Sequence, residues 1–218
     1  MSESASPNEL PASNALTNPI WDSVLPDLQV QSGRLVAGVV DFDDRLGHGF
    51  WWQASSESKS TDMVRIMTTC EGTPQDTWPA SSPFQQIVRE EIGTEKKLVL
   101  LAVGMAGKTH WSGTIEGDAM NEAIAMDFAA RVNTTPDFVG STYLIDDAWT
   151  AELQTNSDGS NQSISLKHGK QDVRIVFDSI GPHKLSLDAN KLVLTFQPDF
   201  PATKHNQTLR WRFVIRSV

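Results

Sequence analysis

The C-terminal stretch Thr208-Leu209-Arg210-Trp211-Arg212-Phe213-Val214-Ile215-Arg216 decides the fold of this chain. Large apolar side chains occupy every second position from Leu209 to Ile215, and arginines fill most positions between them. Successive side chains of a β-strand point to opposite faces of its sheet. The alternation therefore predicts a strand with one buried face and one wet face.

Similar short runs recur along the sequence, separated by Gly, Pro, Asn and Ser. They predict strands over residues 34–42, 48–54, 62–70, 96–104, 109–117, 123–132, 141–146, 163–168, 172–178, 184–188, 191–197 and 208–216. So many short strands joined by turns are typical of an all-β, mainly antiparallel fold. We expect a two-sheet β-sandwich, with a closed β-barrel as the alternative.

One helix signal competes with this pattern. Ser82 can cap a helix, Pro83 suits its first position, and Gly93 can end it. An apolar stripe at helical spacing lies between them: Phe84, Ile87, Val88 and Ile92. The sequence therefore predicts a short helix over residues 83–92.

The domain organisation follows from composition. Residues 1–19 are rich in Ser, Asn, Pro and Ala, which predicts a disordered leader. At 218 residues the chain is long enough for one sizeable core, so we expect a single β-sandwich domain over residues 20–218.

Charge and cysteine content exclude several classes of function. The net charge of −9 disfavours nucleic acid and anionic lipid as partners. Cys70 is the sole cysteine, so neither an internal disulfide nor a cysteine-based zinc site is expected. No apolar run approaches the roughly 20 residues of a membrane span, and the N-terminus lacks the features of a secretory signal. We expect a cytoplasmic protein without a cofactor or resident metal.

Residues 102–109, Ala-Val-Gly-Met-Ala-Gly-Lys-Thr, match a loose phosphate-binding loop. A working loop of this kind leads into a helix whose N-terminus holds phosphate. Here the next residues alternate like a strand, so a β-hairpin is predicted. Nucleotide binding through Lys108 and Thr109 remains the less favoured interpretation.

The strand after this turn carries a polar face formed by Lys108, His110, Ser112, Thr114 and Glu116. Such residue types can perform acid–base chemistry. An enzyme would gather its site from several strands, and the candidate catalytic residues are His48, His110, Glu116, Asp127 and Arg131. A solvated outer sheet face is the favoured interpretation, because side chains two apart on one strand stand nearly parallel.

The segment 41–48 is acidic and joins two predicted strands. Asp41, Asp43 and His48 could hold a divalent cation, but Arg45 and Leu46 interrupt the ligand series that a calcium loop needs. A charged turn is favoured.

Tryptophan provides the positive sign of binding, since the chain has seven Trp and one Tyr. Trp51 and Trp52 are adjacent and must point to opposite faces of a strand. Trp78 and Trp149 fall near predicted turns, where exposed indoles can stack on a ligand. We therefore predict a non-catalytic module that binds a small ligand, a carbohydrate as the first choice, or a protein, through Trp52, Trp78 and Trp149. The enzyme and the nucleotide binder are the alternatives.

Overall fold

The computed structural model describes residues 24–42, 44–53, 63–70, 73, 75–155, 162–169, 174–180, 183–188, 193–198 and 206–218. The predicted leader, residues 1–19, lies outside them. No helix long and apolar enough for a membrane span occurs in this described part of the chain. Its regular elements are strands: β1 (Val24–Ser32), β2 (Leu35–Asp41), β3 (Leu46–Gln53), β4 (Met63–Thr69), β5 (Phe84–Ile92), β6 (Lys97–Ala106), β7 (Thr109–Asp118), β8 (Ala123–Val132), β9 (Ser141–Ile145), β10 (Trp149–Thr155), β11 (Gln162–His168), β12 (Arg174–Ile180), β13 (His183–Asp188), β14 (Val193–Pro198) and β15 (Gln207–Ser217).

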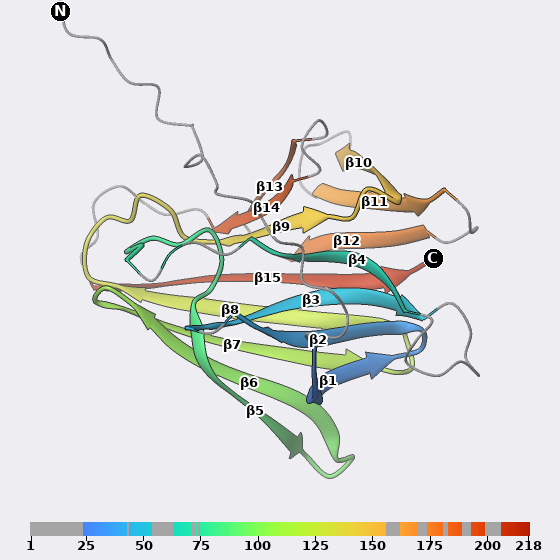
Figure 1. Ribbon diagram of the computed structural model, residues 1–218, viewed down its shortest axis with the longest axis horizontal. Coiled ribbons are helices and arrows are strands. Elements are labelled where there is room, and N and C mark those ends of the chain that lie inside the picture. The colour runs from blue at the N-terminus through green and yellow to red at the C-terminus, as the bar shows by residue number, and fades with distance from the viewer. Residues whose placement is uncertain are drawn as a thin grey trace, which may run out of the picture.

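The strands form one strongly curved antiparallel sheet (Figure 1). Its order is β10-β11-β12-β15-β8-β7-β6-β5-β3-β4-β9-β14-β13, with β2 and then β1 added beside β3. The two ends approach each other, since β13 lies against β10, β11 and β12. The predicted all-β antiparallel fold is confirmed, and the sheet is barrel-like and nearly closed.

The sheet divides naturally at the junction of β3 and β5. In the described residues these strands share one bridge pair, Leu46 with Phe84, whereas β3 pairs with β4 over five residue pairs. The first stack is β1-β2-β3-β4-β9-β14-β13, and the second stack is β5-β6-β7-β8-β15-β12-β11-β10. The architecture thus lies between the predicted sandwich and the closed barrel.

Strand β15 runs through the middle of the second stack, between β8 and β12. Its burial alternates residue by residue from Leu209 to Ile215, with the apolar side chains buried and Arg210, Arg212 and Arg216 exposed. Its predicted parity is confirmed. Ten consecutive residue pairs join it to β8, so the strand at the end of this sequence fixes the register of the sheet centre.

An aromatic layer fills the space between the stacks. Phe213 of β15 stacks on Phe196 of β14, with ring centroids 3.9 Å apart. Tyr143 of β9 meets both rings edge-on, and Trp211 donates its Nε1–H to Ser141 Oγ at 2.9 Å. Aromatic pairs in these geometries contribute more than their area burial alone.

Gly113 makes room for this layer on β7. A Cβ atom placed there would lie 2.3 Å from Cδ1 of Phe128 and 3.0 Å from Cζ of Phe84. Phe84, Phe128 and Trp211 then follow one another with centroid separations of 5.7 and 5.9 Å. The absence of a side chain at Gly113 lets Phe128 lie flat against the sheet.

A smaller apolar cluster lies on the other face of the first stack. It contains Val24, Val36, Val40 and Trp51, whereas Trp52 belongs to the main core. The prediction that Trp51 and Trp52 point to opposite faces is confirmed.

The predicted helix over residues 83–92 is wrong, because these residues form strand β5. It pairs with β6 along its whole length, from Phe84 opposite Gly104 to Ile92 opposite Lys97. A bulge between Phe84 and Gln86 puts both Phe84 and Ile87 on the buried side, which imitates a helical stripe in the sequence. Val88 and Ile92, the other members of that stripe, are exposed.

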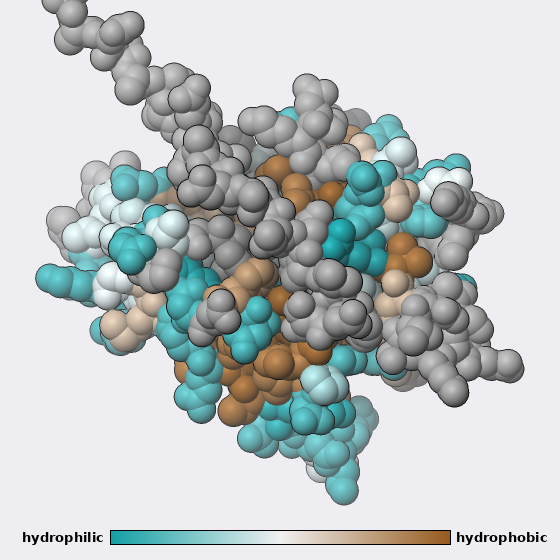
Figure 2. All heavy atoms as spheres, viewed as in Figure 1, coloured by the Kyte–Doolittle hydropathy of each residue, from teal (hydrophilic) through white to brown (hydrophobic). Residues whose placement is uncertain are grey.

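β1 is the end strand of the first stack and β5 is the end strand of the second stack, and these two strands are not paired in the described residues. β1 pairs with β2 and lies against β5, β6 and β7 without a strand pairing to them in the described residues. Leu25 and Leu28 of β1 pack against the core while staying partly in solvent. Figure 2 shows apolar surface over the part of this view that β1, β2 and β5 occupy in Figure 1.

We expect Trp211→Ala to lower the free energy of unfolding by about 3–5 kcal/mol, because it empties a fully buried site and orphans Ser141. Urea unfolding measures this loss. The neighbouring variant Arg210→Ala removes a side chain that is 69% exposed, so it should cost at most about 1 kcal/mol. Equal losses for the two variants would contradict the assigned faces.

Candidate functional site

Strand β7 places its predicted polar face on the outside of the second stack. His110 and Ser112 are exposed, Thr114 and Glu116 are half-buried, and the intervening Trp111, Gly113 and Ile115 face the core. The prediction of a solvated outer face is confirmed.

The register places each of these residues beside known neighbours. His110 lies between Met105 of β6 and Arg131 of β8, and Thr114 lies beside Asp127. In the next row, Ser112 lies between Val103 and Ala129, and Ala129 lies beside Arg210 of β15. We call this surface the outer patch, formed by Val103, Met105, His110, Ser112, Ala129, Arg131 and Arg210.

The candidate catalytic residues do not converge. His110 and Glu116 are six residues apart on one strand, about 20 Å along it. Glu116 forms an ion pair with Lys97, in which Oε2 lies 2.8 Å from Nζ. Asp127 Oδ1 accepts a hydrogen bond from Arg210 Nε at 2.6 Å. Asp127 also raises the pKa of Arg210, by its hydrogen bonds first and its charge second. Both carboxylates thus act as ion-pair partners, and of the other candidates only Arg131 lies directly beside His110.

His48 lies in the core, on strand β3. It is 1% exposed on the inner face of β3, and its ring is surrounded by Phe50, Phe128 and Tyr143. His48 Nε2 lies 2.7 Å from the hydroxyl of Tyr143. Burial lowers the pKa of His48 to about 3, so the imidazole is neutral at physiological pH.

Several buried side-chain polar atoms have no hydrogen-bond partner in the described part of the chain, and three of them are His48 Nδ1, Ser82 Oγ and Trp111 Nε1. Trp111 packs edge-on against Trp211, and Ser82 immediately precedes Pro83 and β5. A neutral imidazole enclosed in this way can exchange hydrogen bonds, but it offers no base to a substrate in solvent.

The acidic turn does not assemble a metal site in the described part of the chain. Asp41 is exposed at the end of β2, while His48 points into the core, so the predicted ligands diverge. Asp43 lies outside the described residues. No group of three His, Cys, Asp or Glu side chains suited to a metal occurs among the residues described.

The predicted binding tryptophans are largely buried. Trp149 is 1% exposed and begins β10, where its Nε1–H donates to the carbonyl of Arg65 at 2.8 Å. Trp52 is 5% exposed beneath Arg34, and Trp78 is half-buried against the core. The expectation of exposed loop indoles is wrong for Trp149, since the chain uses this indole as an anchor. Exposed indoles were the reason for expecting a carbohydrate ligand, so the structure no longer favours that ligand.

The phosphate-loop match forms a hairpin between β6 and β7. Gly107 adopts a φ of 57° in its turn, and Thr109 begins a strand rather than a helix. The hairpin prediction is confirmed. Phosphate would meet no helix N-terminus here, which removes the basis of the nucleotide interpretation.

Sequence reasoning missed the apolar part of the outer patch. Val103 and Met105 of β6 are 51% and 48% exposed. The apolar run from Leu98 to Val103 is typical of a strand buried on both faces. The alternation within β6 is visible only once its neighbours are known, because both parities are apolar.

His48 should make stability depend on pH. Between pH 6.5 and about 3 the unfolded chain binds a proton at His48 that the folded chain does not, so stability falls as the pH falls. Its contribution reaches at most about 1.4 kcal/mol per pH unit. Urea unfolding from pH 7.5 to 4.5 should show a shallower decline for His48→Gln than for the unaltered protein. The exposed-histidine control His110→Gln should keep the original slope; equal slopes for both variants would contradict the assignment.

A scan against protein-family models finds no match to this chain, and a search of curated proteins finds no matching relative. What the surface can bind must therefore be argued from its geometry.

Proposed function

We propose that this protein is a non-catalytic binding module whose outer patch takes an acidic segment of a partner protein. The observation that carries the proposal is the pairing of exposed apolar side chains with unneutralised cations on one sheet face. Val103 and Met105 supply the apolar part of the outer patch and Arg131 supplies charge, with the exposed Lys108 in the adjoining β6–β7 turn.

The charge balance of the patch favours an anionic partner. Asp127 forms an ion pair with Arg210, and Glu116, at the other end of β7, forms one with Lys97. Arg131 and Lys108 have no ion pair in the described part of the chain. A local excess of positive charge on a chain with a net charge of −9 thus lies beside His110.

The form of the patch favours an extended segment. Small side chains, Ser112 and Ala129, separate the apolar strip on β6 from the arginines on β8 and β15. A segment in which apolar and acidic residues recur could set apolar side chains on Val103 and Met105 and carboxylates on Arg131. Arginine is well suited to this task because its planar fork binds a carboxylate through two hydrogen bonds.

The proposal can be tested with fluorescein-labelled peptides of repeating Glu and Leu, and matched peptides with Lys or Gln in place of Glu. We expect only the Glu peptides to bind. Arg131→Glu and Met105→Asp should each weaken binding about tenfold or more, equivalent to about 1.4 kcal/mol. Added salt should weaken it further because the charges are exposed. Fluorescence anisotropy measures each Kd.

Lys96→Glu is the matched control, since it makes the same change of charge in the β5–β6 turn, away from the patch. Its Kd should equal that of the unaltered protein. Equal losses for Lys96→Glu and Arg131→Glu would indicate a general charge effect, and an absence of binding to the Glu peptides would overturn the proposal.

A further inference from the structure

Strand β5 presents one edge without a backbone partner over most of its length. From Gln86 to Ile92 it pairs with β6, and its other edge meets β3 at Phe84 alone in the described part of the chain. Figure 1 shows the strand at the margin of the molecule, diverging from the first stack. Such an edge is a template on which another strand can add.

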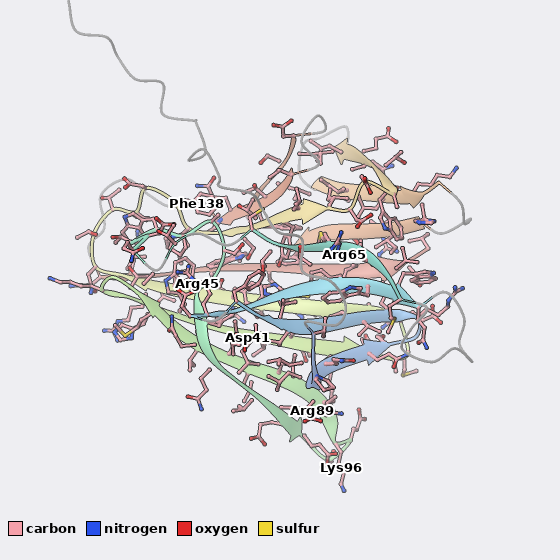
Figure 3. The ribbon with its side chains drawn as sticks, in the orientation of Figure 1. Asp41, Arg45, Arg65, Arg89, Lys96 and Phe138 are labelled. Carbon is pink, nitrogen blue, oxygen red and sulfur yellow. The ribbon has the colours of Figure 1, made fainter. Side chains whose placement is uncertain are left out.

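The side chains of β5 are exposed from Val88 to Ile92. Every residue from Val88 to Lys97 is exposed, and Val88 and Ile92 are 37% and 47% exposed. Arg89, Glu90 and Glu91 form no ion pair with any described residue. Figure 3 shows Arg89 and Lys96 at the end of the molecule formed by the β5–β6 hairpin.

The two faces of β5 carry different chemistry. Val88 lies opposite Leu101 and Glu90 opposite Val99 on the outer side. Arg89 and Glu91 lie opposite Leu100 and Leu98, on the side that faces the first stack. A partner strand must match an apolar pattern on one face and a charge pattern on the other.

We propose that this partner is β5 of a second copy of the chain, paired antiparallel about a two-fold axis at Glu90. Arg89 then lies opposite Glu91 of the other copy, and the symmetry repeats this ion pair. On the outer face, Val88 lies opposite Ile92 of the other copy, again twice. Opposite charges and apolar pairs at directly facing positions stabilise a sheet, and a two-fold axis makes the surface self-complementary.

Neighbouring registers do not offer this match. In a continuous sheet, directly paired residues point to the same face, so both must be even-numbered or both odd-numbered. The two-fold axis must therefore pass through a residue and cannot lie between two residues. Centred on Arg89, the pairing sets Arg89 against itself and Ile87 against Glu91. Centred on Glu91, it sets Glu91 against itself and Glu90 against Ile92. The axis at Glu90 costs one like-charge contact, Glu90 with Glu90.

The dimer should be weak, because a single strand pair buries less than a standard interface. Sedimentation velocity over the micromolar range should show the unaltered protein shifting from monomer to dimer as concentration rises. Arg89→Glu and Glu91→Arg should each weaken the dimer at least tenfold. Glu90→Gln should tighten it by removing the like-charge contact.

A charge swap tests the register itself. The double variant Arg89→Glu, Glu91→Arg restores both ion pairs with their signs exchanged, so it should dimerise like the unaltered protein. Lys96→Glu matches the charge change of Arg89→Glu outside the paired residues, and Arg131→Glu alters the outer patch. Both should leave dimerisation unchanged, which separates this proposal from the proposed acidic partner.

A monomer at the highest concentration would overturn the proposal. So would a double variant as weak as its parents, since another interface or register would then hold the copies together. Amide hydrogen exchange at two concentrations locates the contact. Residues 88–92 should gain protection at the higher concentration, and protection confined to other strands would also overturn the proposal.

Discussion

The contact between β15 and the first stack holds the molecule together. Phe213 stacks on Phe196, Tyr143 meets both rings, and Trp211 reaches Ser141 across the space between the stacks. These side chains can meet because β15 alternates strictly and lies at the centre of its stack. The same alternation places arginines outside, so one constraint produces both the sealed core and the charged outer surface. The enclosed His48 is neutral for the same reason, since burial disfavours its charged form.

Strands with a clean period of two could be predicted from the sequence. β7 and β15 each have one apolar and one polar parity, and the structure reproduces both faces. The strands β1, β5 and β10 could not be found in this way. β1 contains Pro26 and an irregularity in its register between Val24 and Gln29. β5 imitates a capped helix, and β10 begins at a tryptophan that follows a turn. In each case pairing with the next strand along the chain overrides the local signal.

The candidate site was predictable only in part, for a related reason. Periodicity brought His110 to the outer face, and Arg131 could be named as a candidate, but their adjacency depends on the register of β7 against β8. The burial of individual side chains was harder still to predict from the sequence. Trp149 and His48 were both predicted beside turns, yet each belongs to a strand whose pairing draws it inward. Consequently the two surfaces proposed for binding, both among the described residues, are a sheet face and a strand edge. In a β5-paired dimer the outer patches of two copies would lie on one continuous sheet, and a partner with two acidic segments could bind both.

The position of β15 also bears on how the chain folds during synthesis. Residues 207–217 separate β8 from β12, so the second stack remains in two pieces until they leave the ribosome. Until then β8 exposes an unpaired edge, and Phe128, Tyr143 and Phe196 lack the aromatic partners that β15 supplies. A nascent chain in this state exposes apolar surface to chaperones and to other nascent chains. Closure of the second stack is therefore expected to be a late and cooperative step that waits for β15 to insert between β8 and β12.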